Sequence, residues 1–222
     1  EIYTRCHLIP SVGGQPPRSA FGHIFSRQLG LLRHLGVIEM PEKSSDLEML
    51  ERLQIACDGF DIINDPAGDL VELASYMESR PIAIVGPTEL MPALNRFKNQ
   101  LNENSARFTR IGVIPEMNHN ESVAWGGVGG DKDPASDQQV LLFLTWEGMH
   151  KRVSHRIDWM IAHTTTDFAW KMQGEGSTLL ESLLHLCIVM DWLSIALALL
   201  HGKDPAAIGP ISALKDFLNS KN

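Results

Sequence analysis

Residues 98–121 read KNQLNENSARFTRIGVIPEMNHNE, and this stretch decides the predicted fold. Residues 98–104 have the composition of a helix end, and residues 107–115 form a short apolar strand. The six residues that follow, 116–121, hold two carboxylates, two amides and one imidazole. Ligands of open α/β sheets bind beyond the carboxyl ends of the strands. We therefore expect the polar clusters at 102–104 and 118–120 to flank this strand where a site would lie.

The rest of the chain alternates between predicted strands and helices. Strands are predicted at 81–85, 107–115, 139–146 and 166–173, and helices at 18–35, 46–56, 69–79, 89–104, 149–163, 177–201 and 211–218. Strands that alternate with helices are typical of βαβ units, whose strands are parallel. The sequence therefore predicts an α/β fold, a three-layer αβα sandwich with a mostly parallel sheet of four to five strands.

The domain organisation is read from the first residues. A strand is expected at 3–9, and residues 11–17 hold two glycines and two prolines, which favour a linker. We interpret residues 1–17 as a linker, or as a residual strand from a preceding domain, and residues 18–222 as one domain. The chain has no initial Met, so we expect it to be a fragment.

Composition limits the class of partner. The net charge of −8 argues against a nucleic-acid partner, whose phosphates need a basic surface. The apolar run at 183–200 contains Asp191, and an aspartate at the centre of a bilayer costs about 2.5–3.5 kcal/mol. A buried helix is therefore predicted, with no membrane partner. Three scattered cysteines and no visible signal peptide favour a reducing, cytoplasmic location, and no metal site is predicted.

A family resemblance rests on four motifs. They are KNQLNEN at 98–104, PEMNHN at 115–120, PRSA at 17–20 and ISALK at 211–215. Together they resemble the second sugar-isomerase (SIS) domain of the bifunctional phosphoglucose/phosphomannose isomerases, over almost the whole chain. The resemblance implies an αβα fold and an enzyme that interconverts glucose 6-phosphate or mannose 6-phosphate with fructose 6-phosphate. It also implies a sugar-phosphate substrate, a homodimer, and no metal or organic cofactor.

The resemblance assigns four catalytic residues. It matches Glu103 to the base that moves a proton between C1 and C2 of the sugar. It matches His119 to the group that opens the sugar ring, contributed to the neighbouring subunit's site, and Lys215 to a lysine that works beside it. It matches Arg18 to a guanidinium that stabilises negative charge on the enediolate.

The residues alone leave plainer interpretations open for three of these positions. Glu103 is then a solvated carboxylate at a helix end, His119 a surface or capping histidine, and Lys215 a solvated lysine. Arg18 differs, because two prolines precede it and it begins a predicted helix, so its direction is fixed. If Glu103 is not the base, Glu116 or Glu121 becomes the candidate.

Two departures from the family pattern limit the expected activity. The family's first SIS domain holds a Ser/Thr-rich loop that grips the phosphate, and no such loop occurs here. We therefore expect residues 1–222 to be an inactive C-terminal half. A threonine associated with mannose phosphate is matched here by Gly209, which puts phosphomannose activity in doubt, and Asn104 is the other expected substrate-binding position. The alternatives are a non-catalytic SIS module that binds a sugar phosphate or mediates dimerisation, and a nucleotide-binding α/β domain.

Overall fold

The computed structural model describes residue 10 and residues 13–221. The chain forms two compact units, residues 1–48 and 49–222, and each is described by itself. The division falls inside helix α2 (Lys43–Gly59), whereas the domain boundary at residue 17 stays a prediction. The strand expected at 3–9 lies outside the described residues.

The smaller unit holds α1 (Phe21–His34) and the first residues of α2. Gly36, with φ of +69°, follows the end of α1, as expected for a glycine just beyond a helix. Arg33 donates to the Asp46 carboxylate at 2.7 Å and so joins the two helical segments. The predicted helix at 18–35 is present, but it begins three residues later than expected.

The larger unit is built on four parallel strands in the order β2-β1-β3-β4. The strands are β1 (Ile82–Pro87), β2 (Thr109–Ile114), β3 (Val140–Trp146) and β4 (Ala169–Gly174). The central strand β1 is buried along its whole length, because it is covered on both faces, as its unbroken apolar sequence predicts. The prediction of a mostly parallel sheet is confirmed, with four strands.

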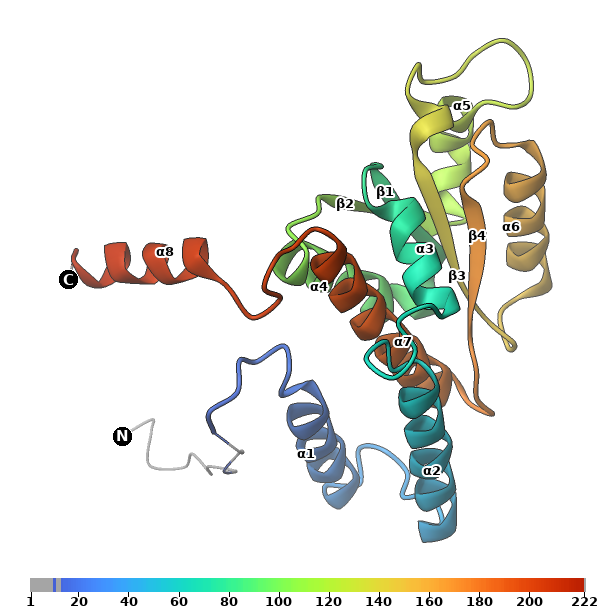
Figure 1. Ribbon diagram of the computed structural model, residues 1–222. Helices are drawn as coiled ribbons and strands as arrows, with labels where there is room; N and C mark the ends of the chain where they lie inside the picture. Colours follow the sequence, from blue (N-terminus) through green and yellow to red (C-terminus); the bar gives the residue numbers. More distant parts are fainter. Residues whose placement is uncertain (1–9, 11–12, 222) are drawn as a thin grey trace. The chain divides into compact units, whose positions relative to one another are not determined.

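Helices cover both faces of this sheet (Figure 1). One face packs on α3 (Asp69–Met77), α4 (Met91–Asn104) and α7 (Leu179–Leu200); the other packs on α5 (Glu121–Trp125) and α6 (Lys151–His163). Successive residues of a strand point to opposite faces, so Ile84 joins the first core and Val85 the second. The expected three-layer αβα sandwich is confirmed.

Helix α7 is apolar on all sides, as expected for a buried helix. By length and composition it is the helix among residues 13–221 that would pass for a membrane span, but 56% of that apolar window is buried inside the protein. Its Asp191 accepts hydrogen bonds from Arg96 at 2.5 Å and Gln100 at 2.7 Å, both on α4. Burial raises the pKa of the Asp191 carboxyl, although the Arg96 guanidinium opposes that change. The prediction of a core helix is confirmed.

Short helical turns are the elements that the sequence did not reveal. They are η3 (Glu116–His119), η4 (Ser136–Gln138) and the five-residue α5, whereas η2 (Thr88–Leu90) overlaps the start of the helix predicted at 89–104. One turn has no repeating apolar pattern, which is the main sequence signal for a helix. The last helix, α8 (Gly209–Asn219), is present close to its predicted range.

Candidate active site

The two polar clusters of the sequence flank β2, as expected, and they lie at its opposite ends. Helix α4 runs back to the amino end of the sheet, so Glu103 lies before β2 begins, whereas His119 follows its carboxyl end. A six-residue strand rises about 3.3 Å per residue, so the ends of β2 are about 20 Å apart. Glu103 and His119 of one chain therefore lie at opposite ends of the same strand.

Glu103 lies in the last turn of α4 and is partly exposed. The next residue, Asn104, is only 5% exposed, and its side-chain amide donates to Ser194 Oγ of α7 at 2.8 Å. The main-chain carbonyls of Glu103 and Asn104 both accept from the Lys203 ammonium. Asn104 thus packs between two helices here, and its expected contact with substrate stays a prediction.

His119 is exposed at the end of η3, beyond the carboxyl end of β2. The two nearby carboxylates differ in their surroundings. Glu116 is exposed, whereas Glu121 forms an ion pair with Arg110 and follows Asn120, whose side-chain oxygen accepts from the Glu121 amide. His119 is thus accessible at the surface, and its predicted role in a neighbouring subunit's site stays a prediction.

Lys215 and Gly209 both lie on α8, whose residues are all exposed. Gly209 is the first residue of this helix, and Lys215 follows almost two turns later. One side of α8 carries apolar side chains that are 39–57% exposed, namely Ile211, Leu214, Phe217 and Leu218. The structure thus places Lys215 on an element with no core contacts among the described residues.

Arg18 belongs to the smaller unit and lies in a turn just before α1. The amides of Ser19 and Ala20 both donate to the Pro16 carbonyl, at 3.0 and 3.1 Å. This turn holds the backbone of Arg18 outside the helix, rather than at its first residue as expected. Arg18 is partly buried, and its predicted role beside the other site residues stays a prediction.

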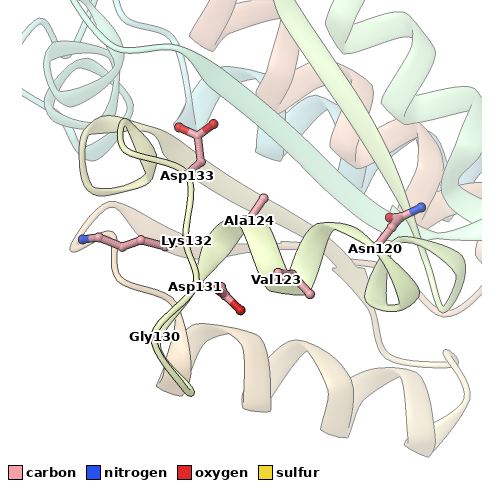
Figure 2. Close-up of a pocket in the computed structure, with 7 residues that line it drawn as sticks. All are labelled: Asn120, Val123, Ala124, Gly130, Asp131, Lys132 and Asp133. Carbon is pink, nitrogen blue, oxygen red and sulfur yellow. The ribbon is translucent and has the colours of Figure 1, made fainter.

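A cavity of about 450 Å³ lies between α5 and the loop at 130–133 (Figure 2). It is lined by Asn120, Val123, Ala124, Gly130, Asp131, Lys132 and Asp133. The Lys132 ammonium pairs with the Asp137 carboxylate, which leaves Asp131 and Asp133 to set the charge of the cavity. Two carboxylates disfavour an anionic sugar phosphate. None of the six predicted site residues lines this cavity.

The largest pKa shifts lie outside the predicted site. The Arg52 guanidinium, which donates to both oxygens of the buried Glu181, holds the pKa of that carboxyl at about 2. Burial lowers the pKa of His185 and raises the pKa of the Cys187 thiol to about 12, so Cys187 stays protonated and inert. No cluster of three metal-ligating side chains occurs within the described part of the chain.

Comparison with known proteins places the chain in a family. The family described as bacterial phospho-glucose isomerase C-terminal SIS domain matches residues 68–218, which lie in the larger unit. The chain is 30% identical over 217 residues to a bifunctional phosphoglucose/phosphomannose isomerase from Aquifex aeolicus, covering 96% of this chain and 62% of that protein. A protein of the same name from Thermoplasma acidophilum is 24% identical over 209 residues, covering 91% of this chain and 59% of that protein. The chain thus spans about three fifths of the length of these relatives.

A solved structure supports the same fold. The crystal structure of a glucose-6-phosphate isomerase like protein from Thermus thermophilus superposes with a TM-score of 0.55 at 14% identity, covering 75% of this chain and 57% of that chain. At this identity the likeness concerns the fold alone. The family match extends over 151 residues, from α3 through α8, and includes every strand of the sheet. The chain therefore belongs to the family of bacterial phospho-glucose isomerase C-terminal SIS domains.

Proposed function

We propose that the protein containing this chain is a sugar-phosphate isomerase. It interconverts glucose 6-phosphate or mannose 6-phosphate with fructose 6-phosphate. The observation that carries this proposal is the family match over residues 68–218, which contains Glu103, His119 and Lys215 within the motifs that resemble the isomerases. The relatives that align with almost the whole chain carry the same name.

The proposed chemistry needs one base and one group that stabilises negative charge. The Glu103 carboxylate removes the proton on C2 of the open-chain aldose, and the electron pair forms a C1–C2 enediolate with its charge on O1. Arg18 stabilises that charge through its guanidinium. Return of the proton to C1, with transfer of the O2 proton to O1, gives the ketose. Electrons are neither gained nor lost by the sugar, so the reaction requires no redox cofactor.

Ring opening precedes this step, and His119 and Lys215 are the proposed groups. An imidazole can both accept and donate a proton, so His119 can exchange a proton with the ring oxygen and the C1 hydroxyl. Because Glu103 and His119 of one chain lie at opposite ends of β2, we propose that His119 serves the site of a second chain. The functional form is then a cytoplasmic homodimer with two identical sites, and each site is built from residues of both chains.

The site within these 222 residues is incomplete in this proposal, because the Ser/Thr-rich phosphate loop of the family is absent. Binding energy from a remote phosphate normally lowers the chemical barrier, so residues 1–222 alone should not turn over glucose 6-phosphate. Gly209 stands where the family has the threonine linked to mannose 6-phosphate, so glucose 6-phosphate is the preferred aldose. The second candidate is a non-catalytic sugar-phosphate-binding or dimerisation module, which the exposed apolar side of α8 favours.

A coupled assay separates these candidates. The complete gene product that contains this chain, and residues 1–222 alone, are supplied with fructose 6-phosphate, and formation of glucose 6-phosphate is followed. We expect turnover by the complete protein and none by the chain alone. No turnover by the complete protein, together with binding of fructose 6-phosphate, would support the non-catalytic module instead.

A further inference from the structure

The ammonium group of Lys203 lies among four main-chain carbonyl oxygens. It donates to Glu103 O at 3.0 Å and Asn104 O at 2.9 Å, and also to Asp204 O at 3.0 Å and Ala207 O at 3.3 Å. The first two oxygens end helix α4, and the other two belong to the turn that leads into α8. We call these four oxygens the carbonyl cluster.

The two helix ends explain why a lysine lies there. The end of α7 closes in a Schellman turn, in which Lys203 N donates to Ala198 O and Gly202 N to Leu199 O, both at 2.9 Å. This turn fixes the backbone of Lys203 beside the end of α4. The last carbonyls of a helix have no partner within the helix and form the negative end of its dipole. The ammonium satisfies these carbonyls directly, and because it has three N–H groups for four oxygens, one N–H is shared between two of them.

We propose that Lys203 is a positioning residue for Glu103, an inference that rests on the proposed role of Glu103 as the base. The Lys203 ammonium holds the main chain of Glu103 and Asn104 against the turn that leads into α8. The hydrogen bond from the Asn104 side-chain amide to Ser194 Oγ adds a second connection, which joins the same turn of α4 to α7. Lys203 touches no substrate atom in this scheme and acts only through the backbone of Glu103.

Loss of the ammonium should move the base without unfolding the domain. The side chains of Phe97 and Leu101 hold α4 in the main core, and both are fully buried. The last turn of α4, beyond Leu101, is held by the Lys203 ammonium and by the hydrogen bond from Asn104 to Ser194. A displacement of about 1 Å at a catalytic group can reduce the rate about 10²-fold.

The test uses the complete isomerase and three variants. Lys203→Met removes the charge but keeps the length of the side chain, and Lys203→Arg restores donors to the cluster. Lys171→Met is the matched control, because the Lys171 side chain is exposed and its ammonium pairs with Asp158. We expect Lys203→Met to lower kcat about 10- to 100-fold with KM changed less than about threefold. Lys203→Arg should recover most of kcat, and Lys171→Met should match wild type.

A double variant tests whether Lys203 acts through Glu103. In a Glu103→Gln background, Lys203→Met should lower kcat no further, because the group that it positions is already gone. An equal fold-loss in both backgrounds, or an unchanged kcat in Lys203→Met, would overturn the proposal.

Hydrogen exchange distinguishes this inference from the proposed function. In residues 1–222, the amides of Ser105 and Arg107 donate to Leu101 O and should exchange faster in Lys203→Met. Unchanged exchange overturns the positioning role whatever the activity. Absence of isomerase activity in the wild-type complete protein, with faster exchange in the variant, would refute the proposed function and leave the structural contact intact.

Discussion

Subunit complementation gives the sharpest prediction about the proposed site. The ends of β2 are about 20 Å apart, so each site combines Glu103 of one chain with His119 of the other. In a heterodimer of Glu103→Gln and His119→Ala chains, one site carries both changes and the other carries neither. Random reassociation makes about half of the dimers heterodimers with one intact site, so the mixture should regain about one quarter of wild-type activity.

The assay starts from two separately purified variants of the complete protein, each slow with the closed-ring sugar phosphate. They are dissociated in mild denaturant, mixed in equal amounts and allowed to reassociate. The control mixes the same variants without dissociation, and a second control treats each variant alone in the same way. Activity in the treated mixture that equals the mean of the two variants would refute the shared site, because both residues would then serve the same chain.

Two further predictions concern the fold around the site. The pKa of Glu181, about 2, lies below its ordinary 4.5. Glu181→Gln should therefore lower the free energy of unfolding by about 1–2 kcal/mol at pH 7, after allowance for solvent screening at the half-exposed Arg52 side chain. This loss of stability is fully present above pH 4.5 and disappears as pH falls toward 2. If urea unfolding gives the same difference in free energy of unfolding between wild type and Glu181→Gln at pH 7 and at pH 2.5, the prediction is contradicted. Gly127→Ala places a Cβ 1.1 Å from His163 O, whereas Gly129→Ala, also at positive φ, meets nothing within 4 Å. Gly127→Ala should lower the free energy of unfolding by at least about 2 kcal/mol more than Gly129→Ala does in the same experiment. Equal losses in the two variants would show that the loop shifts to accommodate the new methyl group.

The sheet could be predicted from the sequence because its strands are apolar and separated by longer periodic helices. PIAIV at 81–85 and QVLLFLTW at 139–146 became β1 and β3, the two central strands. The short helices η3 and α5 could not be predicted, because a single turn has no period. Helix α8 extends only two residues before and one residue beyond its predicted range, because ISALKDFL has a clear amphipathic pattern.

The candidate site was only partly predictable. Glu103 and His119 are 16 positions apart, and the family resemblance assigned His119 to the neighbouring subunit's site rather than to the site of Glu103 in the same chain. In a parallel sheet the residue just before a strand and the residue just after it lie at opposite ends of that strand, so the predicted topology already implied that Glu103 and His119 are separated. Lys203 could not be found this way, since the carbonyls that it binds come from segments 99 and 100 residues away and from its own turn.

Hydrogen exchange at C2 of the sugar phosphate tests the role of Glu103 most directly. The complete protein is incubated with glucose 6-phosphate in deuterated water, and deuterium at C2 is followed for wild type and Glu103→Gln. General-base catalysis contributes about 10²–10⁴-fold, so the variant should lose exchange and kcat by that factor while KM changes little. Exchange in Glu103→Gln at near the wild-type rate would show that Glu103 is not the base, and Glu116 or Glu121, at the other end of β2, would take its place.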